Sequence, residues 1–272
     1  MNVQELKKHA NHVRQNILTA TFHAQSGHPG GSLSSADVLT YLYFEVMDIT
    51  KENAGSLNRD RFVLSKGHVT PGLYSVLAEK GLIDQEDIPS FRKLGSKLQG
   101  HPNMDMVEAV DMSTGSLGQG ISCAIGMALA NKLDKNNHRI YTLLGDGECQ
   151  EGEVWEAAMS AAHYNLDNLV VMVDCNHLQI DGAVEDVMNV YPLDKKFEAF
   201  GFDVTVADGH DFDSIQKAFD HVKTVKGKPA CILWNTIKGK GVSYMENNAA
   251  WHGNAPKEDL YKRGMEELGG LR

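Results

Sequence analysis

The sequence predicts an α/β fold, a mostly parallel sheet with helices on both faces, and two patterns support this prediction. Short apolar runs rich in β-branched residues alternate with longer segments of helical period, which is typical of crossover units on a parallel sheet. Most of these runs are almost continuously apolar, as expected of strands that helices cover on both faces. The chain has 272 residues, 42% of them hydrophobic, so it can bury a sizeable core.

The expected strands lie at residues 62–64, 140–144, 169–173, 202–206 and 231–234. In the fourth run, Phe202, Val204 and Val206 alternate with polar residues. This alternation indicates an edge strand with one face towards solvent, whereas the other runs belong to the buried part of the sheet.

Helical segments fill the spaces between these strands. Residues 3–24 and 34–47 precede the first strand and form an expected helical layer, and residues 151–164 and 256–268 are expected helices further on. Two further segments carry an apolar stripe with helical spacing: Leu117, Ile121, Ile125, Leu129 and Leu133 in one, and Phe212, Ile215, Phe219 and Val222 in the other.

A single domain is expected over residues 1–272, with an N-terminal helical layer and a C-terminal helix, because no repeat or linker divides the chain. The longest irregular stretches, 96–116, 176–191 and 239–256, are rich in glycine, histidine and asparagine. Long loops of this kind in a compact α/β domain are usually where the functional site lies.

Charge and cysteine content exclude several classes of protein. The 26 basic and 36 acidic residues leave a net charge of −10, which disfavours binding to nucleic acid or to a membrane surface. The four cysteines are spread singly, as in reduced cytoplasmic proteins. The N-terminus is polar and no apolar run is long enough for a membrane helix, so neither export nor anchoring is expected.

Oxygen donors follow two successive strands of the expected sheet. Asp146 stands between Gly145 and Gly147 at the end of one strand, and Asn176 follows the next. The carboxyl ends of parallel strands meet at one edge, so these side chains should converge where open α/β sheets bind ligands. Carboxylate and amide oxygens suit a hard cation, Mg²⁺ or else Ca²⁺ or Mn²⁺, whose remaining oxygens would come from a diphosphate.

A glycine-rich turn opens an expected helix over residues 117–133. Its sequence, residues 115–120 (GSLGQG), would present backbone N–H groups and the positive end of a helix dipole to a phosphate. It lacks the Lys-Ser/Thr ending of the loops that bind nucleoside triphosphates, and this disfavours such a ligand. Either this turn or Gly-Asp-Gly alone could be purely structural, and their joint occurrence at strand ends favours a binding site.

The Gly-Asp-Gly motif followed by Asn176 resembles the metal-binding signature of thiamine diphosphate enzymes, with Cys175 where the first asparagine of an Asn-Asn pair often stands. Further stretches across the chain are similar to transketolase: residues 26–30 (SGHPG), 64–68 (LSKGH), 99–102 (QGHP), 115–120, 145–152 and 251–253 (WHG). The chain therefore resembles the N-terminal, diphosphate-binding part of a transketolase.

The resemblance implies a set of site residues. Asp146, Asn176 and the backbone carbonyl of Leu178 would hold the metal. The residues expected at the cofactor are Gly115, Ser116, Leu117, Gly145, Asp146, Gly147, Glu148, Asn176, Ile180, His68 and His252.

Four loop histidines, His28, His68, His101 and His252, are expected to be catalytic, and the resemblance supports each of them. All four stand beside glycine or proline, so a ligand can approach them closely. Neutral imidazole both donates and accepts a proton, which suits chemistry at ketose hydroxyl and carbonyl groups. Glu151 matches an acidic residue of a relay between two cofactor sites, although a carboxylate in a first helical turn would explain it equally well.

The activity that the resemblance implies is transfer of a two-carbon ketol unit from a ketose to an aldose, with sugar phosphates or related sugars as substrates. The pyrimidine-binding domain of a transketolase does not follow here, because the chain ends at Arg272 after one expected helix. We therefore expect a split enzyme, most simply an α2β2 assembly, whose partner chain supplies the pyrimidine and C-terminal domains and without which this chain is inactive.

Two alternatives remain. The chain could be the α subunit of a 2-oxo acid dehydrogenase component, but the four-histidine set and the absence of a serine-rich loop near the C-terminus argue against this. It could also be a non-catalytic, cofactor-binding relative of transketolase, against which the intact Asp146, Asn176 and histidine set speaks.

Overall fold

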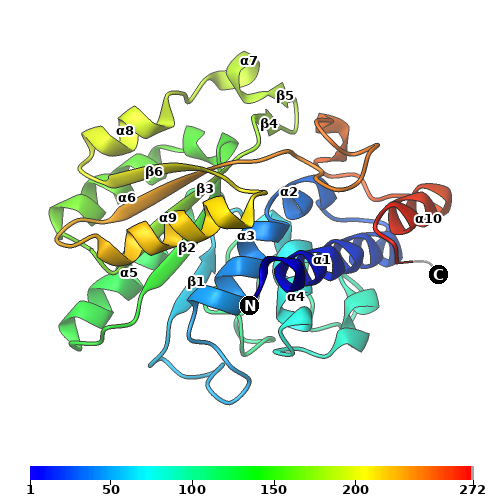
Figure 1. Cartoon of the computed structure of the whole chain (residues 1–272), viewed down its shortest axis with the longest axis horizontal. Helices are drawn as coiled ribbons and strands as arrows, with labels where there is room; N and C mark the ends of the chain where they lie inside the picture. The colour runs from blue at the N-terminus through cyan, green and yellow to red at the C-terminus, as the bar shows by residue number, and fades with distance from the viewer. Residues whose placement is uncertain (271–272) are drawn as a thin grey trace.

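The computed structural model describes residues 1–270, and its centre is a five-stranded parallel sheet (Figure 1). The strand order is β1-β2-β3-β7-β6. The strands are β1 (Arg61–Leu64), β2 (Ile140–Gly145), β3 (Leu169–Cys175), β6 (Asp203–Asp208) and β7 (Ala230–Asn235). All five expected strands are confirmed, and β6 lies at the edge that the alternation predicted. Residues 271 and 272, the end of the predicted domain, lie outside the described residues.

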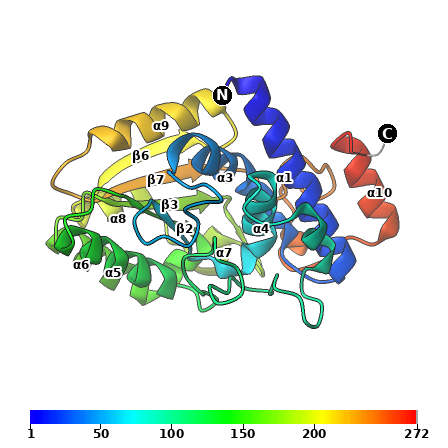
Figure 2. The ribbon, with the colours of Figure 1, turned by 90° about the horizontal axis from the view of Figure 1, so that it is seen from below.

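Helices cover both faces of the sheet, and the alternation of side chains along each strand explains why. In β3, Val170 and Met172 belong to one hydrophobic cluster, while Leu169, Val171 and Val173 belong to the other. One face is covered by α5 (Gln119–Leu133), α6 (Gly152–His163) and α8 (Leu193–Ala199), and the opposite face by α9 (Phe212–Thr224) (Figure 2).

Chain direction decides which face each helix covers. The β2-to-β3 connection moves one way across the sheet, whereas the β6-to-β7 connection moves back from the edge. Because parallel crossovers are almost always right-handed, the reversed step places α9 on the face opposite α6. The predicted stripe of α9 is confirmed, since its four apolar residues are all buried.

The N-terminal layer contains α1 (Val3–Ala24), α2 (Pro29–Ser34), α3 (Ala36–Tyr41) and α4 (Thr70–Glu79). A capping box between Asn2 and Glu5 begins α1, which fills the predicted range 3–24. The segment predicted as one helix over 34–47 instead begins at Ala36 and ends in a π-helical turn at Leu42–Val46. The C-terminal helix, α10 (Glu258–Glu267), packs on α1.

Two predictions about local structure were wrong. The helix predicted over 117–133 begins at Gln119, and its supposed stripe is broken because Leu133 is 82% exposed. A spacing of four residues advances about 40° beyond a full turn, so such a stripe rotates away from the core. The stretch 176–191, predicted as irregular, contains a hairpin of β4 (Leu178–Gln179) and β5 (Gly182–Ala183), followed by α7 (Val184–Met188).

All four cysteines are free, and three of them are buried. Across residues 1–270, no helix combines the length and the apolar character needed to cross a bilayer.

Candidate functional site

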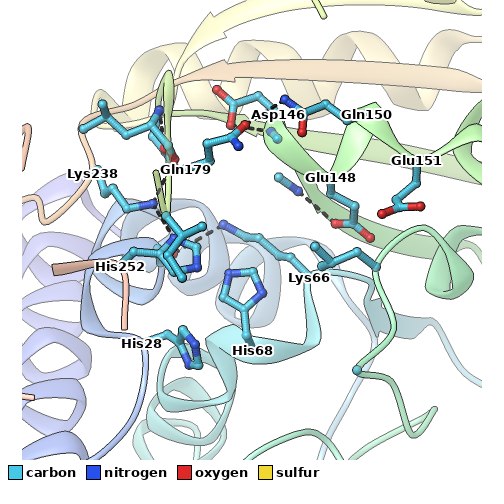
Figure 3. A pocket seen from close by; sticks show the side chains of 18 residues that line it. His28, Lys66, His68, Asp146, Glu148, Gln150, Glu151, Gln179, Lys238 and His252 are labelled. Atoms are coloured by element: carbon cyan, nitrogen blue, oxygen red, sulfur yellow. Dashed lines mark hydrogen bonds between the residues drawn. The ribbon is translucent and has the colours of Figure 1, made fainter. Parts of the chain in front are cut away.

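A cavity of about 330 Å³ lies at the carboxyl ends of four neighbouring strands (Figure 3). Each strand leads into a loop that lines it: β1 into His68, β2 into Asp146, β3 into Asn176 and β7 into Lys238. The parallel order of the sheet therefore brings together residues that are far apart in the sequence. Ligands bind open α/β sheets in this position.

Asp146 is 2% exposed and is held by three hydrogen bonds from neighbouring groups. Its Oδ1 accepts from the backbone N–H of Gly147 at 2.8 Å. Its Oδ2 accepts from the backbone N–H of His177 at 2.7 Å and from the Tyr191 hydroxyl at 2.9 Å. The carboxylate is thus oriented by groups from both strand ends.

Asn176 is oriented by the buried ion pair between Lys66 and Asp174. Its Nδ2 donates to Asp174 Oδ2 at 2.8 Å, and the same oxygen accepts from Lys66 Nζ at 2.5 Å. Because the amide N–H₂ points to Asp174, its Oδ1 is left as an acceptor and receives the N–H of Leu178 at 3.1 Å. The role of Asn176 as a metal ligand stays a prediction, and its Oδ1 is the atom that would serve.

The three predicted metal ligands could bind a cation because each of their oxygens still has an unused lone pair. A carboxylate or carbonyl oxygen has two lone pairs, and Asp146 Oδ1, Asn176 Oδ1 and the Leu178 carbonyl each use one. The Leu178 carbonyl accepts from Lys238 Nζ at 2.9 Å. In residues 1–270 no group of three histidine, cysteine or acidic side chains could hold a metal, so a cation here would depend on this mixed oxygen set.

The ionised form of Asp146 is disfavoured by its surroundings when no cation is bound. Burial raises the pKa of Asp146, the negative charge of Asp174 raises it further, and the hydrogen bonds from Tyr191, Gly147 and His177 only partly oppose this. A bound cation would favour the ionised carboxylate, and so the acid is suited to a metal site.

The glycine-rich turn is held against the Gly-Asp-Gly turn by Glu148, which is 3% exposed. Glu148 Oε1 accepts from the N–H of Gly118 at 2.9 Å and from the Ser65 hydroxyl, and its Oε2 accepts from the N–H of Gly145 at 3.0 Å. Gly118 has a φ of +83°, and a Cβ there would lie 2.9 Å from the Cβ of Glu151, so this turn requires glycine.

This arrangement corrects one expectation about the turn. The turn over residues 115–120 was expected to present free backbone N–H groups to a phosphate, but Glu148 already accepts the N–H of Gly118. Gly115 and Leu117 line the cavity beside Gly145 and Gly147, whereas Ser116 is exposed and lies outside the lining.

Replacing Glu148 with glutamine should weaken thiamine diphosphate binding roughly 10-fold, because an amide cannot accept from all three donors and one N–H would face another. Isothermal titration calorimetry with Mg²⁺ present measures this. Glu156→Gln, at an exposed position on α6, is the matched control and should bind as the unaltered protein does. Equal affinities for the two variants would show that Glu148 does not hold the turns in place.

Three of the four predicted histidines form one cluster. The rings of His28 and His68 lie 5.0 Å apart between centroids, those of His28 and His252 5.5 Å, and those of His68 and His252 5.1 Å. All three line the cavity. Within the described residues, the buried Nδ1 of His28 has no hydrogen-bond partner.

Burial keeps these histidines neutral. It lowers the pKa of His28 to about 4, with Arg92, His101 and Lys238 contributing, and that of His252 to about 3, with Lys238 the next cause. Burial also lowers the pKa of His68 well below its usual value. Near pH 7 each ring can therefore donate from one nitrogen and accept on the other.

The remaining predicted residues are exposed, and two of the three line the cavity. His101 is exposed, lies outside the lining and packs against Gly115. Glu151 is exposed at the start of α6, and Ile180 is 64% exposed in the β4–β5 turn; both line the cavity. Such exposed positions can contact a second chain.

Two buried lysines at the cavity, Lys66 and Lys238, were missed as site residues. Each is 2% exposed. Lys66 pairs with Asp174, whereas Lys238 Nζ contacts the Leu178 carbonyl and lies 3.2 Å from His252 Nδ1. A usable signal was present for Lys238, because it follows shortly after an expected strand and is flanked by a glycine.

Comparison with known proteins identifies the family. The family described as "Transketolase, thiamine diphosphate binding domain" matches residues 6–270. The chain belongs to the transketolase family. It is 44% identical over 264 residues to the 6-deoxy-6-sulfo-D-fructose transketolase subunit SqwG of Clostridium sp. (strain MSTE9), covering 97% of this chain and 96% of that one. It is 40% identical to one of the apulose-4-phosphate transketolase subunits of Phocaeicola vulgatus, covering 98% and 95%.

Longer transketolases share the fold over part of their length. The transketolase of Campylobacter jejuni superposes with a TM-score of 0.92 at 38% identity, covering 99% of this chain and 43% of that one. Human transketolase is 40% identical over 98% of this chain and 42% of its own length. This member of the transketolase family therefore corresponds to the diphosphate-binding part of these longer proteins.

Proposed function

We propose that this chain is the diphosphate-binding subunit of a two-chain transketolase, which transfers a two-carbon ketol unit from a ketose to an aldose. The observation that carries the proposal is the cavity itself. Three oxygen donors and three neutral histidines line it together at the ends of neighbouring strands. Family membership supports it, as does coverage of nearly the whole length of relatives that are described as subunits.

Thiamine diphosphate is the proposed cofactor, and Mg²⁺ is the proposed cation. When bound, the cofactor supplies the carbon nucleophile and the electron sink for breaking and making the carbon–carbon bond. Asp146, Asn176 and the Leu178 carbonyl would hold the cation. The diphosphate would lie against Gly147 and the ammonium group of Lys238, which supplies positive charge inside the cavity.

The neutral histidines would manage protons at the oxygens of the sugar. His28, His68 and His252 surround one side of the cavity, and their low pKa values leave them able to donate to a carbonyl and accept from a hydroxyl. His101 and Glu151, which are both exposed, would act where this chain meets its partner.

The partner would be a chain that carries the pyrimidine-binding and C-terminal domains, and the simplest assembly is α2β2. Residues 1–272 would form one domain in it, including the helical layer and the C-terminal helix. We place the enzyme in the cytoplasm because its free cysteines suit a reducing compartment.

The substrates proposed are ketoses and aldoses that carry a terminal anionic group. Relatives are named for 6-deoxy-6-sulfo-D-fructose and for apulose 4-phosphate, which are a sulfonated and a phosphorylated sugar. The usual transketolase reaction, between pentose phosphates, is the third candidate to test beside these two sugars.

The test combines the purified chain with a candidate partner that contains the pyrimidine domain, together with thiamine diphosphate and Mg²⁺. Apulose 4-phosphate, 6-deoxy-6-sulfo-D-fructose and xylulose 5-phosphate are offered as donors with an aldose phosphate acceptor, and the products are identified by mass spectrometry. We expect ketol transfer only when both chains are present. Decarboxylation of a 2-oxo acid offered in a parallel reaction, with no ketol transfer from any of the three donors, would refute the proposal.

A further inference from the structure

The loop that follows β7, residues 236–240, carries Lys238 into the cavity, and we call it the Lys238 loop. Lys238 is almost fully buried, and burial lowers its pKa to about 8. Its Nζ is fixed between the Leu178 carbonyl at 2.9 Å and His252 Nδ1 at 3.2 Å. Lysine has a long and flexible side chain, so this placement depends on where the loop holds its backbone.

The backbone of the Lys238 loop is held from outside the cavity on both sides of Lys238, and the carbonyl of Lys238 itself accepts from the N–H of Asn247 at 3.0 Å. The N–H of Ile237 donates to His210 Nε2 at 2.9 Å. The N–H of Gly239 donates to the carbonyl of Gly30 at 2.9 Å, and the carbonyl of Lys240 accepts from Arg14 Nε at 3.1 Å. His210 makes the contact at the residue before Lys238, where it is the side chain that receives a backbone N–H of this loop, and Gly30 makes the contact at the residue after it.

His210 can make this contact only in one tautomer. Because Nε2 accepts from Ile237, the proton must be on Nδ1, which donates to Asp37 Oδ2 at 2.8 Å. Asp37 is in turn paired with both terminal nitrogens of Arg14, and the two side chains are buried. Burial opposes the charge of Asp37, but Arg14 and His210 outweigh it and lower the pKa of the acid.

We propose that His210 is a positioning residue which, oriented by Asp37 and Arg14, holds the Lys238 loop so that Lys238 faces the diphosphate of the cofactor. This inference rests on the proposed function, because the diphosphate is the anion that Lys238 would meet. His210, Asp37 and Arg14 do not line the cavity. They would therefore act through the loop and not by contact with the ligand.

Two substitutions at His210 separate its two hydrogen bonds. Glutamine can place an acceptor oxygen where Nε2 lies, whereas asparagine can replace Nδ1 but is too short to reach Ile237. We expect His210→Asn to weaken thiamine diphosphate binding about 10-fold in calorimetry with Mg²⁺, and His210→Gln to retain most of the affinity. Both should fold, because Gly239 and Lys240 keep their anchors.

A double-mutant cycle tells positioning from a general loss of structure. Lys238→Met removes the ammonium group, so adding His210→Asn to it should weaken binding no further if His210 acts through Lys238. An equal 10-fold loss in both backgrounds would overturn the inference. Equal affinities for His210→Asn and the unaltered protein would overturn it too.

Hydrogen exchange gives a readout that does not involve the cofactor. Mass spectrometry of the free chain should show faster amide exchange across residues 236–240 in His210→Asn than in His210→Gln. Unchanged exchange in His210→Asn would overturn the inference while leaving the proposed function intact. Failure of the unaltered chain, assembled with its partner, to bind thiamine diphosphate would overturn the proposed function, and this inference with it.

Discussion

Replacing Asp146 with asparagine should abolish Mg²⁺-dependent binding of thiamine diphosphate. The substitution keeps the shape of the side chain but removes the one charge among the three proposed metal ligands, and a cation would then face only neutral oxygens. Loss of a supporting residue at a metal site usually costs 10- to 100-fold in affinity, so loss of a ligand should cost more than about 100-fold. Calorimetry with and without Mg²⁺ measures the effect.

Thermal unfolding separates this effect from damage to the fold. Burial raises the pKa of Asp146, so removing its charge offsets part of the cost of the hydrogen bonds that an amide NH₂ cannot accept, and the free chain should still fold. The rise in Tm that Mg²⁺ and thiamine diphosphate cause in the unaltered protein should disappear. Asp186→Asn, at an exposed position in α7, is the control and should keep that rise. A metal-dependent affinity that survives in Asp146→Asn would refute the metal assignment.

Replacing His28 with alanine should lower kcat/KM for the ketose donor about 100-fold in the assembled two-chain enzyme. General acid–base groups typically contribute 10²- to 10⁴-fold, and the neutral ring of His28 has a nitrogen without a partner among the described residues. Steady-state kinetics at pH 7.5 (roughly one unit above the usual histidine pKa) provide the measurement.

The affinity for thiamine diphosphate should stay within about twofold of the unaltered value in His28→Ala, since a group that acts on the sugar affects the chemical step and not cofactor binding. His23→Ala, at an exposed position near the end of α1, is the matched control. A fall in cofactor affinity as large as the fall in kcat/KM would assign His28 to cofactor binding and contradict its proposed role with the sugar.

Local patterns were sufficient to predict the strands and to place the proposed metal ligands at one edge of the sheet. The apolar runs identified β2 and β3, and the residues after each run, Asp146 and Asn176, meet because parallel strands share one carboxyl edge. The alternation in residues 202–206 likewise predicted the edge strand, because a half-exposed strand shows period two in its own sequence.

Glu148 was expected at the cofactor, but the contacts that it makes, and those of His210, could not be predicted from such patterns. The sequence places Glu148 beside a metal-binding motif, and only the fold shows its carboxylate turned inwards to join two turns through Gly118 and Gly145. His210 is 27 residues from Ile237, and its role arises from packing between the loops after β6 and β7. Contacts between loops that are far apart in the sequence produce no repeating pattern from which they could be predicted.

The sequence by itself therefore determined the parallel sheet, the oxygen donors at its edge and the family resemblance, because burial patterns and strand-end motifs are local properties. Tertiary structure alone decided that three histidines meet around one cavity, that His101 lies outside its lining, and that Lys238 enters it from a loop that His210 contacts. The reason is physical: strand order and helix packing set the distances between loops, and these depend on the whole core.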